Sequence, residues 1–400
     1  MKLPRPKVLV TNGEAKSALT VARSLASRGI EVHAGAETRI AITLWSRFVS
    51  RRHMLPSSLK EPGEFVDELV RLQKRWKYDV IIPVADDDIE ALLKCDQALI
   101  GNLKMALPSR KAFETARDKS QMMKAAMAAG VPCPETYFPE EESIESIRER
   151  AKYPLLIKPN ISAGARGITM VARKEDLKSA YDVIVAKWGP AHLQELIPDG
   201  GGQFKSDIAV GRQGETLALF VCKKIRYYPV GGGSSTLITS LRHAQIERDV
   251  PKLTQALGWF GFADFDFIVD PRDGLAKLME CNPRFPESLV INVFSGADFP
   301  WLVYQLAQSS KATPITDYVE GRIARFLVGD IMWFLNSKDR WRAQPNFFRF
   351  LGRDLKYYVE QANDPGPSLC SLIEALRTLL SIRQIKYRFG RGFHKQTAGK

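Results

Sequence analysis

The chain has few cysteines, and no two of them have the spacing of a metal site or a disulfide framework. Five cysteines stand at positions 95, 133, 222, 281 and 370 of a 400-residue sequence. Small secreted domains and zinc modules instead carry dense, regularly spaced cysteines. We therefore expect reduced, mostly buried thiols and a cytoplasmic location.

Long apolar runs are also missing. No uninterrupted apolar stretch approaches the ~20 residues that a membrane helix needs. The first residues, "MKLPRPKVLV", run into the polar segment "TNGEAKS", which is not the pattern of a secretory signal. The 45% hydrophobic and 26% charged composition is that of an ordinary soluble protein. This length predicts roughly two to three domains.

Several nucleotide and metal signatures are absent. "TNGEAKSA", after the first predicted strand, lacks the three glycines that let a backbone approach a dinucleotide pyrophosphate. The Walker motif is absent as well. The five histidines, at 33, 53, 192, 243 and 394, have no metal or triad spacing, so we expect each to be structural.

Positive charge is abundant and unevenly placed. The formal net charge is +13, and residues 321–400 hold 15 Lys and Arg against 6 Asp and Glu. No nucleic-acid motif or interleaved aromatic platform accompanies this excess, so we expect no nucleic-acid partner. Apolar residues at helical spacing, from Leu372 to Leu380, precede a basic end. This pattern predicts a docking helix with a disordered tip, and it leaves open a weak membrane-surface contact through the basic C-terminus.

The order of strand and helix patterns predicts two architectures. "KVLVT" at 7–11, an amphipathic stretch at 15–28 and a strand from Ile30 are followed by "YDVIIPVADDDIEALL", which indicates a doubly wound α/β unit. A helix is predicted at 118–130. The segments "YPLLIKPNISAGARGITMVA", "AHLQELI", "KSDIAV" and "TLALFVCKKI" then predict mixed and antiparallel sheets with helices, an α+β arrangement.

The stretch "LMECNPRFPES" places Glu280, Asn282 and Arg284 at alternate positions, hence on one face of a strand. Upstream, "FADFDFIVDPRDGLAKLME" predicts a hairpin. If its loop has an odd number of residues, Asp264 and Asp266 share that face. Such an oxygen-rich cluster suits Mg²⁺, and a guanidinium beside it suits a phosphate or carboxylate. The alternative is an edge strand with a solvated polar face.

Lys158 ends the apolar run "PLLIK", immediately before the small-residue loop "PNISAGARG". A lysine there neutralises phosphate oxygens, while the loop offers backbone N–H groups in an anion-binding nest. A surface lysine leaving a strand is the alternative interpretation.

Taken together, the ordered segments "RDKSQMMKAAMAAGVPCPET", "YPLLIKPNISAGARG", "LQELI", "FDFIVDP" and "MECNPR" resemble the ATP-grasp superfamily. The similarity covers roughly residues 110–305 and includes the carbamoyl phosphate synthetase, biotin carboxylase and amino-acid ligase branches. It implies a pre-ATP-grasp α/β domain at 1–108 and two ATP-grasp lobes. It divides the rest of the chain into a small lobe at 109–196, a large lobe with the metal site at 197–310, and a basic helical extension at 311–400.

The resemblance also implies roles for nucleotide-binding residues. Lys119 and Lys158 would contact the ATP phosphates, with Arg166 and Gly167 in the loop between them and the next strand. The segment of Glu195, Leu196 and Ile197 would read adenine through its backbone. Gln203 stands where many members carry a ribose-binding glutamate, which is a departure from the family pattern.

Metal and phosphate roles follow from the same resemblance. Asp266, Glu280 and Asn282 would hold Mg²⁺, with Mn²⁺ as a substitute, and Arg284 would contact the transferred phosphate. Asp264 has no clear family role.

The glycine-rich segment "CKKIRYYPVGGGSSTLITSL" is similar to one in carboxylate-amine ligases and suits a carboxylate or an acyl phosphate. Arg226 is preferred over Lys224 as the substrate contact, because a planar fork holds a carboxylate with two hydrogen bonds. A mobile hairpin loop with basic neighbours is equally compatible with the sequence.

The resemblance therefore implies an ATP- and Mg²⁺-dependent ligase that activates a small-molecule carboxylate as an acyl phosphate and joins it to an amine. A carbamoyl-phosphate or carboxylase-type reaction ranks lower, because the chain has no biotin-carrier segment and no duplicated half. An inactive nucleotide-binding scaffold and a peripheral membrane protein are the rivals from other classes. A homodimer is also kept open.

Overall fold

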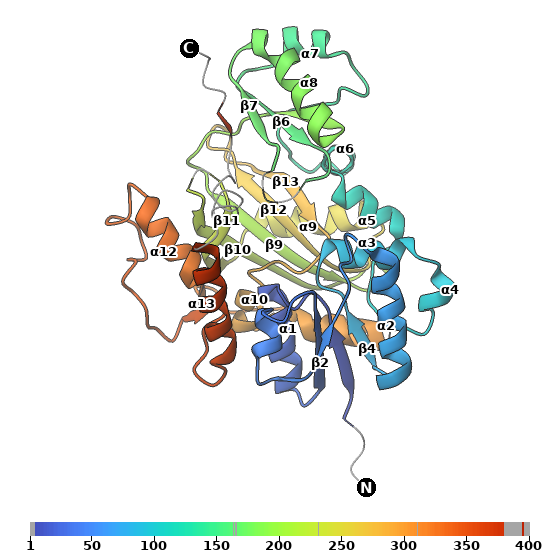
Figure 1. Cartoon of the computed structure of the whole chain (residues 1–400). Helices are drawn as coiled ribbons and strands as arrows, with labels where there is room; N and C mark the ends of the chain where they lie inside the picture. The colour runs from blue at the N-terminus through green and yellow to red at the C-terminus, as the bar shows by residue number, and fades with distance from the viewer. Residues whose placement is uncertain are drawn as a thin grey trace.

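Three β-sheets connected by helices form the computed structural model, which describes residues 5–162, 164, 166–230, 232–309, 311–379 and 394–395. Figure 1 shows the N-terminal sheet at the bottom, the largest sheet in the middle and the smallest lobe at the top. The predicted combination of an N-terminal α/β unit with a two-lobed fold of mixed and antiparallel sheets is confirmed.

The N-terminal sheet has four parallel strands in the order β3-β2-β1-β4. Alternate residues of the first strand face two different cores: Val8 and Val10 pack with the first helix, whereas Leu9 packs with the second. Helices therefore cover both faces, as the continuous apolar strand runs predict. The elements are β1 (Lys7–Val10), α1 (Lys16–Ser27), β2 (Glu31–Ala36), η1 (Ile42–Trp45), β3 (Val49–Met54), α2 (Pro62–Trp76), β4 (Val80–Ile82), α3 (Asp86–Lys94) and α4 (Gln97–Ile100).

The small lobe is built on a five-stranded sheet in the order β16-β7-β6-β8-β5. Its apolar core, which includes Leu155, Ile157, Leu177 and Ile184, is a cluster of its own. The side chain of Asp118 caps the helix predicted at 118–130 by accepting from Gln121 N. The elements are β5 (Thr136–Tyr137), α7 (Ile144–Arg150), β6 (Leu155–Pro159), β7 (Thr169–Val171), η2 (Lys174–Asp176), α8 (Leu177–Trp188), β8 (Ala191–Glu195) and β16 (His394–Lys395). The two helices before this sheet, α5 (Arg110–Arg117) and α6 (Lys119–Ala128), pack in the core of the large sheet instead.

The largest sheet has seven strands in the order β13-β12-β9-β10-β11-β14-β15. One face packs on α9 and α6, and the other shares a single apolar core with α10, α11 and the N-terminal sheet. The large sheet and the N-terminal unit are therefore joined through buried side chains. The elements are β9 (Gln203–Val210), β10 (Thr216–Tyr228), β11 (Ser234–Leu241), α9 (Ala244–Ala256), β12 (Gly261–Val269), β13 (Ala276–Asn282), α10 (Val290–Ser295) and α11 (Phe299–Gln308).

The hairpin of β12 and β13 has the predicted same-face arrangement, but its loop does not have the odd length on which that prediction depended. Asp266 lies opposite Glu280 and Asp264 lies opposite Asn282, so the four polar residues share one face. The connecting segment, residues 270–275, has six residues, and an even loop alone would offset this pairing by one position. A register shift between Asp266 and Phe267 restores it. The same-face prediction is confirmed, and the odd-loop condition is wrong because a β-bulge supplies the extra residue.

The C-terminal segment contains more than the helix predicted from its apolar spacing. That helix is present as α13 (Gly366–Leu379), after α12 (Leu327–Asn336). The same segment also adds β14 (Ile323–Arg325) and β15 (Leu355–Tyr357) to the large sheet. Three-residue strands are too short to show a periodic pattern in the sequence. The predicted basic tip, residues 380–393 and 396–400, lies outside the described residues.

A buried ion network joins the C-terminal segment to the large sheet. The guanidinium groups of Arg226 and Arg325 lie 3.0 and 2.6 Å from Asp330 Oδ2, and each arginine side chain is 1% exposed. Arg226 also donates to the carbonyl of Pro345 and stacks over Trp333. The structure therefore places Arg226 in a structural network, in contrast to the predicted role as a substrate contact.

We expect Asp330→Asn to lower the free energy of unfolding by about 3–5 kcal/mol, because it leaves two buried guanidinium groups without their counter-charge. Chemical denaturation would measure this change. Glu114→Gln is the control: it removes one exposed partner of Arg110, and we expect less than about 1 kcal/mol from it. Equal effects of the two substitutions would contradict the stabilising role of the network.

Candidate active site

Two predicted phosphate-binding lysines face the polar strand of the large sheet. Lys119 is the first residue of α6, and its Nζ donates to the carbonyl of Ser162 at 2.6 Å. The same Nζ lies 3.5 Å from Glu280 Oε2. This contact brings a predicted phosphate ligand, on a helix that packs against the large sheet, to a predicted metal ligand on β13.

Lys158 is buried in β6, where its Nζ donates to Gln194 Oε1. Burial lowers the pKa of Lys158 to about 8; the Glu280 carboxylate opposes this shift, and the charge of Lys119 adds to it. Burial and the two lysines also hold the pKa of His192 well below its ordinary value. Two ammonium groups and a neutral imidazole in one place favour an anionic ligand.

Buried charges of opposite sign alternate across β12, β9 and β10, which lie in the same sheet as the hairpin. Lys205 Nζ is 2.7 Å from Asp264 Oδ2 and 3.3 Å from Asp266 Oδ2. Lys224 Nζ is 2.6 Å from Asp266 Oδ1. Burial alone would raise the pKa of Asp266, but the two ammonium groups lower it below its usual range. The pKa of Asp207, one strand away, is raised well above its usual value by burial and by the charge of Asp264.

The predicted metal ligands lie together on one face of the hairpin of β12 and β13. Glu280 and Asn282 follow each other on one face of β13, and Asn282 Nδ2 donates to Asp264 and Asp266 at 3.2 and 3.3 Å. Within the described residues, no group of three or more His, Cys, Asp and Glu is arranged as a metal site. Mg²⁺ typically takes one or two carboxylates and completes its shell with water and phosphate oxygens. Glu280, Asn282 and Asp266 fit that requirement, although Asp266 already holds two lysines.

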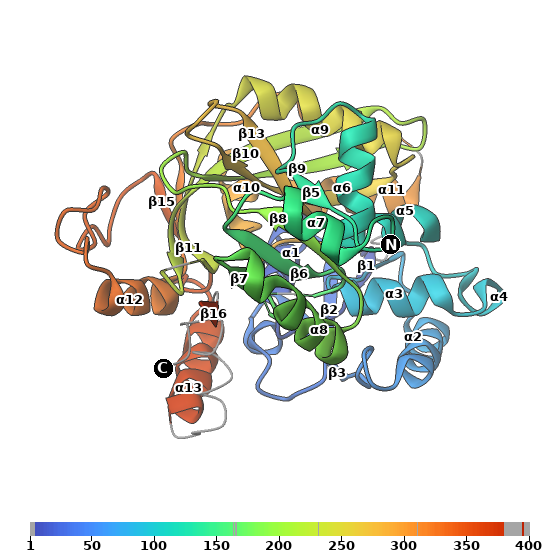
Figure 2. The same cartoon turned by 90° about the horizontal axis from the view of Figure 1, so that it is seen from above.

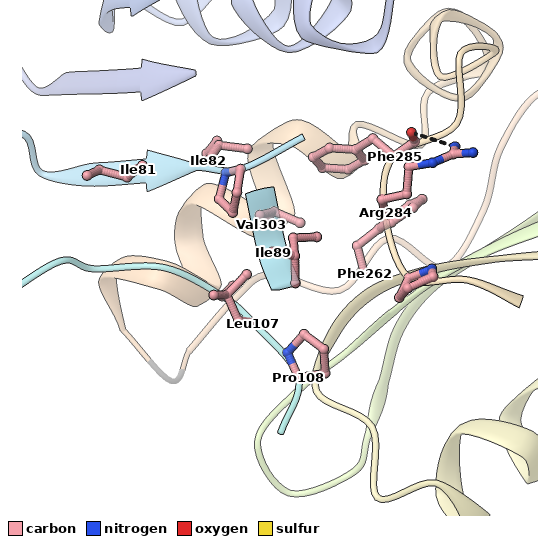
Figure 3. Close-up of a pocket in the computed structure, with 12 residues that line it drawn as sticks. Ile81, Ile82, Ile89, Leu107, Pro108, Phe262, Arg284, Phe285 and Val303 are labelled. Atoms are coloured by element: carbon pink, nitrogen blue, oxygen red, sulfur yellow. Dashed lines mark hydrogen bonds between the residues drawn. The ribbon is translucent and has the colours of Figure 1, made fainter. Parts of the chain in front are cut away.

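Arg284 lies at the junction of the large sheet and the N-terminal unit. Its Nη2 is 3.4 Å from Asn282 Oδ1 and its Nε is 3.3 Å from Asp86 Oδ2, at the start of α3. Figure 3 shows it on the rim of a small apolar pocket, with its guanidinium turned toward the carbonyl of Phe285. The pocket lining in the described structure includes Ile82, Leu107 and Phe262 but none of the predicted lysines, so it is a seam between domains.

A second ion pair crosses the same junction. Lys16, the first residue of α1, donates from Nζ to Glu287 Oε2 at 2.8 Å and from its backbone N–H at 3.1 Å. Burial would raise the pKa of Glu287, but Lys16 lowers it. The sequence did not single out this pair, because its members are 271 positions apart. Glu287, three residues after Arg284, extends the polar face toward the N-terminal unit.

The predicted adenine segment lies where β8 ends. The Glu195 side chain accepts from Arg272 Nη2 at 2.8 Å and lies 3.4 Å from Lys277 Nζ. Leu196 N donates to the carbonyl of Pro154 at 3.3 Å, and Ile197 is buried. Gln203 begins β9, paired with Lys224 on one side and Ile268 on the other. The ion pairs fix the Glu195 side chain, and the backbone N–H groups of Glu195 and Leu196 are bonded to Glu135 and Pro154.

The loop after β6 is partly described, since Ala163 and Ala165 lie outside the described residues. Arg166 and Gly167 form its last turn. Gly167 has φ +74°, and a Cβ at this position would lie 3.0 Å from the ring of Trp188. Close packing of the loop against α8 therefore requires a glycine at 167.

The structure reverses the predicted preference between Lys224 and Arg226. Lys224 reaches Asp266 in the candidate site, whereas Arg226 turns to Asp330. The register of β10 shifts between Lys224 and Arg226 and again at Tyr227. A β-bulge re-aims side chains that alternation would place on one face. Lys205 was missed entirely, although its alternation with Asp207 in "KSDIAV" indicates a charged strand face.

Comparisons with known proteins bear on the family and the fold of the chain. The ATP-grasp domain family matches residues 116–288. The C-terminal section of the carbamoyl phosphate synthase large chain from Methanopyrus kandleri is 28% identical over 177 residues, which cover 42% of this chain and 32% of that relative. The chain thus matches about a third of that relative's length.

Solved structures show the same fold at low identity. Biotin carboxylase from Campylobacter jejuni has a TM-score of 0.65 at 17% identity and covers 80% of this chain and 75% of its own. The L-amino acid ligase from Bacillus licheniformis has a TM-score of 0.59 at 16% identity, with coverages of 78% and 79%. Residues 116–288 therefore match the ATP-grasp domain family, and the fold resembles those of biotin carboxylase and an L-amino acid ligase.

Proposed function

We propose that the protein is an ATP- and Mg²⁺-dependent ligase that activates a small-molecule carboxylate as an acyl phosphate and joins it to an amine. The observation that carries this proposal is the contact between Lys119 and Glu280 at 3.5 Å. It sets a predicted phosphate-binding lysine against the polar face of β13. Phosphoryl transfer depends mainly on positioning and charge neutralisation, which this arrangement supplies.

Each residue has a distinct task in this proposal. Lys119 and Lys158 bind and orient the phosphates, and Arg284 stabilises the charge on the group being transferred. Mg²⁺ held by Glu280, Asn282 and Asp266 would neutralise phosphate oxygens. The substrate carboxylate attacks the γ-phosphorus, ADP leaves, and an amine then displaces phosphate from the acyl carbon. The chain needs no nucleophile of its own, but the lobes must exclude water from the acyl phosphate.

A carboxylation reaction is the second candidate, because biotin carboxylase shares the fold with a TM-score of 0.65. In that reaction bicarbonate takes the place of the organic carboxylate, and the same charged groups would serve. The two candidates differ in the molecule that accepts the phosphoryl group, and they share the site that binds the ATP phosphates.

A substrate screen separates these candidates. We expect ADP release by the purified protein to require Mg²⁺ and to rise when one particular pair of carboxylate and amine is added. Stimulation by bicarbonate without an organic carboxylate would support the carboxylase candidate. If no addition raised ADP release above the rate without substrate, while ATP still bound, the ligase proposal would be wrong.

Glu280→Gln tests the metal assignment. We expect turnover to fall by about 100-fold or more, because the substitution removes an anionic oxygen ligand of the proposed Mg²⁺ that would neutralise the phosphates. The melting temperature should stay near that of the parent, since the Glu280 side chain is partly exposed. Glu145→Gln, an exposed carboxylate at the start of α7, is the matched control. Full turnover in Glu280→Gln would contradict the assignment.

The lowered pKa of Lys158 predicts that nucleotide binding depends on pH. Its pKa of about 8 means that the free enzyme loses this positive charge as the pH rises through 8. We therefore expect kcat/KM for ATP to fall above about pH 8, because a neutral amine binds phosphate weakly. Lys158→Arg keeps the charge and should remove this alkaline decline. A wild-type profile that stays level through this range would show that Lys158 does not bind the nucleotide.

A further inference from the structure

The part of the chain from α12 to α13 exposes an unusual number of large apolar side chains. Nineteen such side chains are exposed in the described residues, and nine of them lie between 331 and 376. Trp341 is 65% exposed and Leu351 is 87% exposed. Both belong to the connection between α12 and β15, residues 337–354, here called the aromatic loop. Contiguous exposed apolar surface of this kind marks an interaction site more often than scattered single residues do.

Two buried arginines of the large sheet hold the backbone of the aromatic loop in a fixed conformation. Arg325 donates to the carbonyl of Arg349 at 3.0 Å and also to that of Phe347. Arg226 donates to the carbonyl of Pro345. Since both arginines are neutralised by Asp330, a buried network in the sheet fixes the backbone of an exposed loop. The loop therefore presents its side chains without a large ordering cost.

Ring contacts order the exposed face of the loop. Phe334, at the end of α12, stacks on Phe347 with ring centroids 4.2 Å apart. Trp341 meets Phe334 edge-on at 5.1 Å and stacks on Phe348 at 6.0 Å. One side of this cluster is buried on the arginines, and the other side faces solvent. Rigid amphipathic rings of this type are enriched at membrane–water interfaces.

The aromatic loop is also basic, and its Lys and Arg residues are here called the basic rim. Residues 337–354 contain five Lys and Arg against two Asp, and one of the two, Asp354, lies 2.6 Å from Arg349. A complementary surface must therefore be anionic.

Helix α13 adds a second apolar face on the same side of the molecule. Cys370 packs inward, where its Sγ donates to the carbonyl of Ile40. Leu369, Leu372 and Leu376 remain exposed at helical spacing. Figures 1 and 2 both show α12 and α13 beside each other, on the side opposite α2 and α4.

We propose that the aromatic loop and the exposed leucines of α13 dock on an anionic lipid surface. Lipid headgroups supply the negative charge, and the interfacial region accepts aromatic and leucine side chains to a shallow depth. A second copy of the chain fits less well, because a two-fold interface would bring two basic rims together. Across the described ranges, every helix falls short of the length and apolarity needed to cross a bilayer, so the contact is peripheral.

Co-sedimentation of the full-length protein with phosphatidylcholine vesicles, with and without phosphatidylglycerol, tests the proposal. We expect binding to the anionic vesicles only, and a loss of about tenfold or more for Trp341→Ser/Leu351→Ser. Leu59→Ser/Val183→Ser is the matched control, because these side chains are 66% and 65% exposed and lie elsewhere. Leu351→Ser alone, which removes no ring contact, should show a smaller loss in the same direction.

The charge of the rim is tested separately. Lys338→Ser/Arg342→Ser should weaken binding about fivefold for each removed charge, and added salt should have a similar effect. Lys60→Ser/Lys111→Ser, also exposed, should bind as the parent does.

Three outcomes would overturn the proposal. One is absence of wild-type binding to anionic vesicles, and another is equal loss in the test and control variants. The third is self-association in lipid-free buffer that Trp341→Ser/Leu351→Ser abolishes, because that result would make the loop an interface between copies. ADP release by the unbound protein is measured in parallel, so that failure of docking is distinguished from failure of the reaction.

Discussion

The arrangement of the candidate site depends on one buried ammonium group. Lys205 lies between Asp264 and Asp266 in the middle strands of the large sheet. Without it, two adjacent carboxylates with Glu280 opposite would repel one another inside the protein, and the hairpin register that aligns them would be unfavourable. The positive charge of Lys205 therefore makes the acidic face of β12 and β13 compatible with burial.

The same physical constraint recurs at the other end of the sheet with the signs exchanged. There a single carboxylate, Asp330, neutralises Arg226 and Arg325. In both places three or more charged groups are buried as a set, and the set fixes the position of a segment that reaches solvent. Lys205 and its partners fix the strand that carries Glu280, and Asp330 and its partners fix the aromatic loop. Removing one member leaves the remaining charges uncompensated, which costs more than the lost contact itself.

Much of the fold was predictable because its signals are local. The apolar strand runs, the cap at Asp118 and the alternation of Glu280, Asn282 and Arg284 are properties of short segments, and the structure contains each of them. The shared face across the hairpin was predicted only on condition of an odd loop; the loop is even, and a β-bulge, which leaves no mark in the sequence, supplies the extra residue.

Residues that meet across long separations were harder to predict. Lys205 pairs with carboxylates about sixty positions away, and Lys16 pairs with Glu287 at a separation of 271 positions. The choice of Arg226 over Lys224 followed general chemistry, since a guanidinium is the better carboxylate ligand. The structure differs from this choice because bulges in β10 turn Lys224 toward the site and Arg226 toward Asp330.

The separate core of the small lobe has a mechanical consequence. The N-terminal unit and the large sheet share one apolar cluster, so they move together or not at all. The sheet of the small lobe has its own cluster, whereas α5 and α6, which precede it in the chain, pack in the core of the large sheet. The contact of Lys119 with Glu280 therefore lies on the large-sheet side and would survive a rotation of the small sheet. Such a rotation would instead break the ion pairs of Glu195 with Arg272 and Lys277, which are exchangeable with water, and would leave both hydrophobic interiors intact.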